Sequence, residues 1–310
     1  MKTSVVLSAY NGEKFILEQL ESIRLQTVSV DEVIILDDCS TDNTAKICQS
    51  FIDKHNLFHW HFEVNAQNKG FVQNFYDGFK KATGEIIFIC DQDDIWQPNK
   101  VERMKYFFNN YPDAVSICSA YSRFYKDTIL DKHVKILNRK KRSIKKINFN
   151  EFCLFYGYLG MATAFKKEIL QYHYKECITT ITYDISVNLI AVLQNGLYYV
   201  DEVLVNRRSY PESTSNKIAT EWKNRQFNGN PLLYNIHRQN LNLKAFKNFI
   251  SNYYENMEYI KITNRYLQIN EKRFRYIENK SFLQWLLCLN EFVKTYPIRK
   301  YITDGLSFLR

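Results

Sequence analysis

Residues 86–98 read Ile-Ile-Phe-Ile-Cys-Asp-Gln-Asp-Asp-Ile-Trp-Gln-Pro, and this stretch decides the fold. Its first four residues form an apolar run, which predicts a short strand buried on both faces. Three carboxylates follow within four positions, at Asp91, Asp93 and Asp94. Like charges at the end of a buried strand lower stability unless a positive charge lies among them. Mg²⁺ or Mn²⁺ meets that need, because both ions prefer carboxylate oxygens and share their remaining positions with phosphate.

An acidic turn in contact with solvent is the alternative explanation of the three carboxylates. Their position favours the metal site. Open α/β sheets bind ligands in the crevice beyond the carboxyl ends of their strands, which is where these acids are expected.

The sequence before this stretch alternates between strand and helix patterns. Strands are predicted over 4–8, 33–36 and 58–64, and helices over 13–26 and 70–83. Together with the strand that begins at Ile86, four strands alternate with helices, so the fold class is α/β with a parallel, doubly wound sheet. The sequence lacks G-x-G-x-x-G, so the dinucleotide-binding fingerprint is absent.

Polar residues follow three of these strands and are expected at one edge of the sheet. Tyr10 can stack on a base beside the backbone that follows Ser8, and Asp38 can accept a hydrogen bond from N3–H of uracil or thymine. Asp91 can hold a ribose hydroxyl while Asp93 holds a metal on a diphosphate. A cation explains why acids occur in a phosphate site, because it inverts the local charge.

Four motifs, in this order and spacing, resemble family 2 of the inverting glycosyltransferases: Ser8–Gly12, Gln26-Thr27, Leu36–Asp42 and Asp91–Lys100. That family has the GT-A fold, a Rossmann-like mixed sheet flanked by helices, and transfers sugars from nucleotide diphosphate donors. The resemblance covers residues 1 to about 215 and leaves 216–310 as a helical extension. Within the family the chain is most similar to bacterial enzymes that build lipopolysaccharide or capsule chains, including rhamnosyltransferases.

The resemblance implies a site for a UDP- or dTDP-sugar and a Mg²⁺ or Mn²⁺ ion. Asp93 is then the metal ligand. The residues assigned to the donor nucleotide are Ser8, Ala9, Tyr10, Asn11, Asp38, Asn74, Asp91 and Gln92.

Asp184 begins a predicted helix, and the resemblance makes it the catalytic base. Sugar transfer with inversion needs one carboxylate near the acceptor hydroxyl, to take its proton as the oxygen attacks C1. The alternative is a negative charge that stabilises the helix at its N-terminal end.

Residues 158–165 resemble the Gly-centred segment that lines the acceptor side in the family. Gly160 and Met161, together with Trp96, are therefore assigned to the acceptor. An ordinary strand explains the same segment equally well.

A strand predicted over 198–207 ends in Arg207-Arg208-Ser209, where the family often has Arg-x-His. The missing histidine would help to hold the metal or the diphosphate. We therefore assign Arg207 and Arg208 to the diphosphate, and the departure puts metal dependence in question.

The two parts of the chain differ in charge. Residues 1–118 contain 11 Lys and Arg against 17 Asp and Glu, whereas residues 119–310 contain 31 against 16. The basic part favours an anionic partner, either lipid headgroups or a phosphate-bearing substrate. No nucleic-acid-binding motif is present, so we expect no nucleic acid.

Two basic stretches each have two possible interpretations. The stretch 132–146 is either a solvated loop or a segment that orders over the diphosphate or meets an anionic lipid carrier. The helices expected over 219–310 include the apolar run 282–289. This run either packs on the catalytic domain or contacts a membrane peripherally.

The seven cysteines lack C-x-x-C spacing and are expected to be reduced thiols of a cytoplasmic protein. The N-terminal apolar run is too short for a signal peptide, and no apolar run spans a membrane. We predict a cytoplasmic glycosyltransferase, in peripheral contact with the inner face of the cell membrane if the basic part binds lipid. It would act on a glycan or lipid-linked acceptor. A non-catalytic nucleotide-sugar-binding protein and a nucleotidyltransferase are the alternatives.

Overall fold

The computed structural model describes residues 1–125, 128–133, 144–155, 158–172, 174–179, 181–210, 220, 224, 226–227 and 229–306. The chain forms two compact units, one of residues 1–148 and 156–209 and the other of residues 149–155 and 210–310. The predicted boundary at 215 lies outside the described residues, as does most of the basic stretch 132–146.

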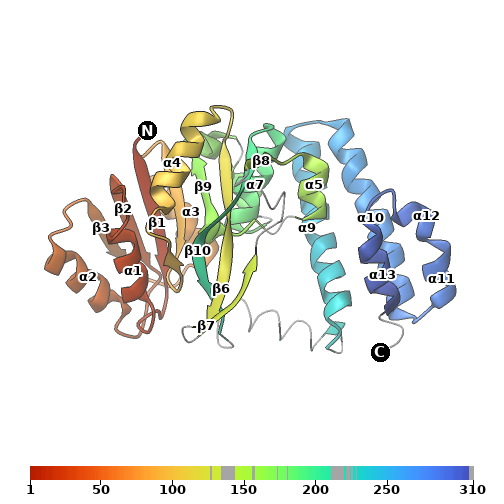
Figure 1. Cartoon of the computed structure of the whole chain (residues 1–310), viewed down its shortest axis with the longest axis horizontal. Helices are drawn as coiled ribbons and strands as arrows, with labels where there is room; N and C mark the ends of the chain where they lie inside the picture. The colour runs from red at the N-terminus through yellow and green to blue at the C-terminus, as the bar shows by residue number, and fades with distance from the viewer. Residues whose placement is uncertain are drawn as a thin grey trace. The chain divides into compact units, whose positions relative to one another are not determined.

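The first unit is a mixed α/β structure, as predicted (Figure 1). Its described strands form one sheet in the order β3-β2-β1-β4-β9-β6-β10-β5, with β7 beside β6 and β8 beside β10. Its elements in chain order are β1 (Thr3–Ala9), α1 (Ile16–Arg24), β2 (Glu32–Asp37), α2 (Thr44–His55), β3 (Trp60–Val64), α3 (Phe71–Lys81), β4 (Ile86–Asp91), β5 (Ile95–Trp96), α4 (Lys100–Asn110), β6 (Ser116–Tyr125), β7 (Thr128–His133), β8 (Ile144–Lys146), the 3₁₀ turns η1 (Gly160–Ala162) and η2 (Lys167–Gln171), β9 (Thr163–Lys166), α6 (Tyr174–Ile178), α7 (Tyr183–Leu193) and β10 (Leu197–Arg208).

The parallel part of the sheet confirms the doubly wound prediction. β1 pairs in parallel with both β2 and β4, and β2 pairs in parallel with β3. The chain moves outward from β1 to β3 and then returns to β4, so right-handed crossovers place α1 and α2 on one face and α3 on the other (Figure 1). The order reverses between β1 and β4, and this is the place where sheets of this kind bind ligands.

Two predicted boundaries shift for local reasons. α1 begins at Ile16 instead of residue 13, because the amides of Phe15 and Ile16 both bond to the Gly12 carbonyl in a turn that precedes the helix. β3 begins at Trp60, since Phe58 is exposed to solvent and lies outside the sheet.

The remaining strands are partly antiparallel and complete the sheet beside the acidic stretch. β9 pairs antiparallel with both β4 and β6. β10 has a register shift between Val200 and Val203, where the sequence has its two acids, and Glu202 forms an ion pair with Arg103 there. β5 pairs antiparallel with the end of β10, which brings the acidic stretch beside Arg207 and Arg208.

The second unit is helical in its described residues, as predicted for the extension. The long helices α9 and α10 pack together, and Asn230 and Asn256 cap them by accepting backbone N–H bonds. No described helix is long and apolar enough to span a bilayer. The elements are α5 (Phe149–Leu154), α9 (Pro231–Tyr253), α10 (Met257–Glu278), α11 (Phe282–Leu287), α12 (Leu289–Phe292) and α13 (Ile298–Leu306).

Candidate active site

The register of three parallel strands brings the first set of predicted residues together. Ser8 pairs with Leu36 on one side and with Asp91 on the other, and Ala9 pairs with Asp37. The ends of β1, β2 and β4 therefore form one continuous edge, and the loops that leave them surround it.

Asp38 is the most firmly held residue of this edge. It is 2% exposed, and its carboxylate accepts hydrogen bonds from the backbone amides of Lys69 and Gly70, both at 2.8 Å, and from Asn65 Nδ2 at 2.9 Å. Charged hydrogen bonds of this kind are strong, so the carboxylate fixes the loop before α3 beside β2. Each carboxylate oxygen can accept more than one hydrogen bond, so Asp38 can also accept one from the N–H of a base.

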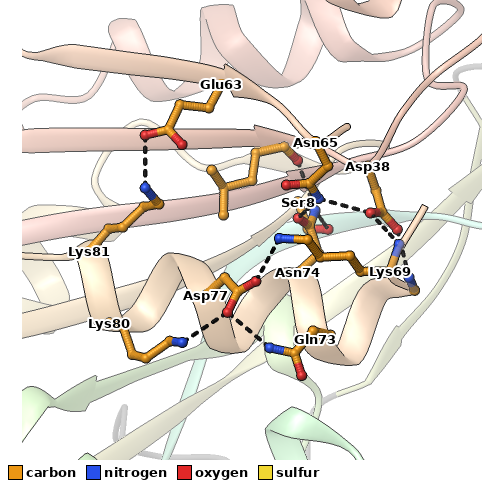
Figure 2. Close-up of polar contacts among 12 residues, drawn as sticks. Ser8, Asp38, Glu63, Asn65, Lys69, Gln73, Asn74, Asp77, Lys80 and Lys81 are labelled. Atoms are coloured by element: carbon orange, nitrogen blue, oxygen red, sulfur yellow. Dashed lines mark hydrogen bonds and ion pairs between the residues drawn. The ribbon is translucent and has the colours of Figure 1, made fainter. Parts of the chain in front are cut away.

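Asn74 joins the same loop to the strands. Its Nδ2 donates to Ser8 Oγ at 2.7 Å and to the Leu36 carbonyl at 2.9 Å, and its Oδ1 accepts from Asn65 Nδ2 at 2.8 Å. Asn65 thus lies between Asp38 and Asn74 (Figure 2). Asn74 is fully buried, so in this structure it braces β1 and β2. Asn65 was missed at the sequence level, because a lone asparagine after a strand carries no distinctive pattern.

The loop after β1 is held by Gln92. Gln92 Oε1 accepts from the Tyr10 amide at 2.8 Å, and Gln92 Nε2 donates to the Tyr10 carbonyl at 2.9 Å. A Cβ atom at Gly12 would lie 2.3 Å from Gln92 Oε1, so a larger residue there would displace the Gln92 side chain from these bonds. Asn11 adopts a positive φ of 49° and its Oδ1 accepts from the Thr41 amide. The Tyr10 side chain remains 45% exposed, as a stacking platform requires.

The acids that follow β4 form a crowded cluster. Burial, together with the charges of Asp93 and Asp184, raises the pKa of Asp91 to about 7. Burial and the charges of Asp93 and Asp91 raise the pKa of Asp94 well above its ordinary value. The Tyr183 hydroxyl donates to Asp91 Oδ1 at 3.2 Å, so the start of α7, with Asp184, lies near the D-x-D motif although the two are far apart in sequence.

This cluster fits an open divalent-metal site. Among the described residues, no three Asp, Glu, His or Cys side chains are placed to enclose one ion. Mg²⁺ in nucleotide sites needs no such cage, because one or two carboxylates hold it together with substrate phosphates and water. The repulsion that raises the pKa of Asp91 is the repulsion that such a cation would relieve. Asp93, whose charge contributes to that repulsion, is the residue that would hold it.

The two arginines of β10 take different positions. Arg208 Nε donates to the Asp93 carbonyl at 3.0 Å, and its guanidinium forms an ion pair with Glu18 at 2.7 Å. The Arg208 amide also donates to Asp94 Oδ1 at 2.9 Å, so Arg208 holds the acidic turn in place. The charge of Arg207 lowers the pKa of both Asp91 and Asp94, which places it toward the cluster. Arg207 is therefore the better placed of the two for a diphosphate.

Asp184 lies in the first turn of α7. It accepts hydrogen bonds from Thr182 Oγ1 at 2.7 Å, from the Ile185 amide at 2.9 Å and from the Gly160 amide at 3.2 Å. Burial nevertheless raises the pKa of Asp184. A carboxylate with a raised pKa accepts a proton more readily, which is the property a general base needs.

The residues assigned to the acceptor side occupy the interior. Trp96 is 2% exposed and Met161 is 1% exposed. Lys100 Nζ donates to the Met161 carbonyl at 2.6 Å and lies 3.6 Å from the centre of the Trp96 ring. In this structure Trp96 and Met161 therefore support the site instead of offering their side chains to an acceptor. A Cβ atom at Gly160 would lie 2.7 Å from Tyr183 Cε2, so glycine lets η1 approach the start of α7.

Lys100 is a further residue that sequence reasoning missed. It is fully buried, and burial lowers its pKa to about 7. Its position at the start of α4 could have indicated a special role, because a positive charge there interacts unfavourably with the helix dipole.

Comparisons with known proteins identify the family of the chain. The family model of Glycosyl transferase family 2 matches residues 4–173, more than half of the 310 residues. An uncharacterized glycosyltransferase of Nostoc sp. is 34% identical over 118 residues, which are 38% of this chain and 35% of that protein. The poly(ribitol-phosphate) β-N-acetylglucosaminyltransferase TarS of Staphylococcus aureus is 38% identical over 96 residues, which are 30% of this chain and 16% of TarS. The matches thus span about a third or less of these curated relatives.

Two solved structures share the fold. The crystal structure of S. aureus TarS 1–349 in complex with UDP has a TM-score of 0.62 at 16% identity, covering 96% of this chain and 82% of that one. The mannosyltransferase PcManGT from Pyrobaculum calidifontis, in complex with GDP-Man and Mn²⁺, has a TM-score of 0.57 at 16% identity, covering 99% of this chain and 85% of that one. On the family match, the four sequence motifs and the shared GT-A fold, the chain belongs to glycosyltransferase family 2.

Proposed function

We propose that the chain is an inverting glycosyltransferase. It would move a sugar from a UDP- or dTDP-sugar to a hydroxyl of a growing bacterial surface glycan, such as lipopolysaccharide or capsule. The observation that carries the proposal is the hydrogen bond from the Tyr183 hydroxyl to Asp91 Oδ1 at 3.2 Å, which brings the start of α7, where Asp184 is the next residue, to the edge formed by β1, β2 and β4. An acid for the donor and an acid for the acceptor must belong to one site if a single sugar is to reach both.

The donor half of the site has groups for each part of a nucleotide. The exposed Tyr10 ring would stack on the base, with Asp38 at its N3–H, and Asp91 would hold a ribose hydroxyl. Arg207 would meet the diphosphate. A Mg²⁺ or Mn²⁺ ion held by Asp93 would supply positive charge to the departing diphosphate when bound. The UDP in the TarS complex and the GDP-Man and Mn²⁺ in the PcManGT complex support this class of donor and ion.

The acceptor half would use Asp184. Its carboxylate would take the proton of the acceptor hydroxyl while that oxygen attacks C1 of the sugar, and the bond from C1 to the diphosphate oxygen would break on the opposite face. The bonds from Thr182 and Gly160 keep the carboxylate in one orientation for this step. The acceptor would be a glycan or a lipid-linked glycan, and the protein would act in the cytoplasm, at the inner face of the cell membrane.

Nucleotide release tests the proposal. The purified protein is incubated with UDP-sugars or dTDP-sugars, with Mn²⁺, and with and without glycan acceptors. We expect UDP or dTDP to accumulate faster with the right acceptor. Binding of a nucleotide sugar, seen as a raised melting temperature, without release under any condition would identify a non-catalytic binding protein instead. Release of pyrophosphate would identify a nucleotidyltransferase.

A further inference from the structure

Helix α13 of the second unit buries a carboxylate and exposes its aliphatic residues, which is the opposite of the usual arrangement. Its buried residues are Tyr301 and Asp304, whereas Ile298, Ile302 and Leu306 are 52%, 53% and 53% exposed. Those three aliphatic residues are spaced by four and lie on one stripe of the helix. A helix that only packs on a core buries its aliphatic stripe and exposes its carboxylate. Packing within the second unit therefore does not explain why the aliphatic stripe of α13 is exposed.

A buried polar network sets this orientation. Asp304 accepts hydrogen bonds from Arg273 Nε at 2.7 Å, from Arg273 Nη2 at 2.9 Å and from the Tyr276 hydroxyl at 2.6 Å. Arg273 and Asp304 are almost completely buried, and rotating α13 would leave Arg273 buried without its partner. The aliphatic stripe is thus held outward by α10.

Helix α11 adds a second apolar stripe next to the first. None of its six residues is buried, and Phe282, Leu283, Leu286 and Leu287 are all more than half exposed. The Trp285 ring stacks on Tyr301 of α13 at 4.5 Å, and a Cβ atom at Gly305 would lie 2.5 Å from Trp285. The two helices are therefore in close contact. The apolar C-terminal face is defined by Phe282, Leu283, Leu286, Leu287, Ile298, Ile302 and Leu306.

Within residues 280–306, the charged side chains that form no ion pair with a described residue are all positive. Lys280, Lys294 and Arg299 are exposed, and none of them forms an ion pair with any residue that the structure describes. The two acids of the same segment are paired, because Asp304 pairs with Arg273 in the interior and Glu291 pairs with Lys272 at the surface. An apolar stripe with basic residues beside it matches a lipid surface, where apolar side chains enter the acyl boundary and cations meet anionic headgroups.

We propose that the apolar C-terminal face docks on an anionic lipid bilayer. Leu283, Leu286 and Ile302 would enter the headgroup boundary, with Lys294 and Arg299 at the phosphates. A second copy of the chain is a poorer occupant, because a two-fold interface would bring the same unpaired cations of both copies together. This inference names the surface for the membrane contact but does not depend on sugar transfer, since its readout is binding alone.

Vesicle co-sedimentation of the full chain tests the inference. We expect binding to vesicles that contain phosphatidylglycerol, little binding to pure phosphatidylcholine, and a loss of binding as salt rises, since the Debye length falls from about 10 Å at 0.1 M to about 3 Å at 1 M. Lys294→Gln and Arg299→Gln should each lower the affinity about five-fold. Equal binding to both vesicle types, or no binding at low salt, would overturn the proposal.

Matched variants distinguish lipid binding by this face from nonspecific binding by other exposed apolar residues. Leu283→Glu and Ile302→Glu change exposed positions and should abolish vesicle binding while the melting temperature stays the same. Leu241→Glu is the control, because Leu241 is 47% exposed on α9 of the same unit but outside the face. Equal loss in the control would overturn the assignment of the face. A dimer in solution that Ile302→Glu converts to a monomer would show that a second copy covers the face and would also overturn it.

Discussion

The Tyr183 hydroxyl donates a hydrogen bond to Asp91 Oδ1 at 3.2 Å, across 92 positions of sequence. The Tyr183 ring also stacks on Phe75 of α3, with ring centres 4.1 Å apart. One side chain therefore links the end of β4, the helix α3 and the start of α7. Because Asp184 is the next residue, this contact ties the backbone of the candidate base to Asp91.

Replacing Asp184 tests the base directly. A positioned general base contributes about 10²–10⁴-fold, so Asp184→Asn should lower kcat by that order. Donor affinity should change little, since the proposed nucleotide contacts lie at β1, β2 and β4. Measuring kcat and donor Kd on the same variant checks this. Loss of both would assign Asp184 to structure or to the metal, and loss of neither would leave it as a charge at a helix end.

Asp93→Asn should abolish turnover and weaken Mn²⁺-dependent nucleotide binding with the fold intact. The reason is that the amide is neutral and cannot offset the charge of a divalent ion. Calorimetric titration of UDP with and without Mn²⁺ measures the effect, with the exposed Asp53→Asn on α2 as control. Full activity of the wild type after EDTA treatment would contradict the metal assignment and leave Arg207 as the diphosphate partner.

The raised pKa of Asp91 predicts an unusual pH dependence of stability. Its pKa is about 7 in the folded chain and about 3.9 when unfolded, so between these values the folded state binds more protons. The contribution of this carboxyl to the free energy of unfolding should therefore fall as pH rises from about 4 to 7. Asp91→Asn should flatten that part of the profile in metal-free urea titrations. An unchanged slope would show that Asp91 titrates normally.

Tyr183→Phe isolates the hydrogen bond from the ring packing. The bond from Tyr183 lowers the pKa of Asp91, so removing it should raise that pKa further. The proposed ribose contact of Asp91 uses the carboxylate form, so the pH midpoint of donor binding should move upward in the variant. Donor Kd measured from pH 6 to 9 checks this, and Tyr76→Phe on α3 is a control that leaves Asp91 untouched. The prediction is wrong if the two variants give the same profile.

Lys100→Met should destabilise the first unit and impair catalysis. It leaves the buried Met161 carbonyl without its donor, which costs about 1–3 kcal/mol of unfolding free energy. Met161 follows Gly160, whose amide bonds to Asp184, so kcat should fall more than donor affinity. Urea unfolding and steady-state kinetics measure both effects, with the exposed Lys46→Met as control. Wild-type values of both would exclude a positioning role.

In the second unit, Asp304→Asn should lower the free energy of unfolding by about 3–5 kcal/mol, because it leaves Arg273 charged and buried without its partner. Glu291→Gln is the matched control, since its pair with Lys272 is exposed and such pairs contribute about 0–1 kcal/mol. Similar effects of the two variants in denaturant titrations would contradict the role of Asp304 in holding α13.

The sequence by itself determined the doubly wound half of the sheet and the family. Buried parallel strands are continuous apolar runs, as in residues 86–90, and helices show their own period, so both patterns are local and readable. The motifs at the strand ends are equally local. Because parallel strands end at the same edge, the proximity of Ser8, Asp38 and Asp91 also followed from the pattern.

Only the tertiary structure decided which residues complete the site. From the sequence, Trp96 was assigned to the acceptor side beside three acids, whereas in the structure it is buried and Lys100 lies over its ring. A local pattern cannot distinguish the position of Arg207 from that of Arg208, because the pairing of β10 with β5 joins distant parts of the chain. It also cannot show which side of α13 is buried, because the Arg273–Asp304 contact that decides this is made across a long stretch of chain. Such contacts depend on the free energy of burying a specific partner, and a local sequence pattern does not contain the partner.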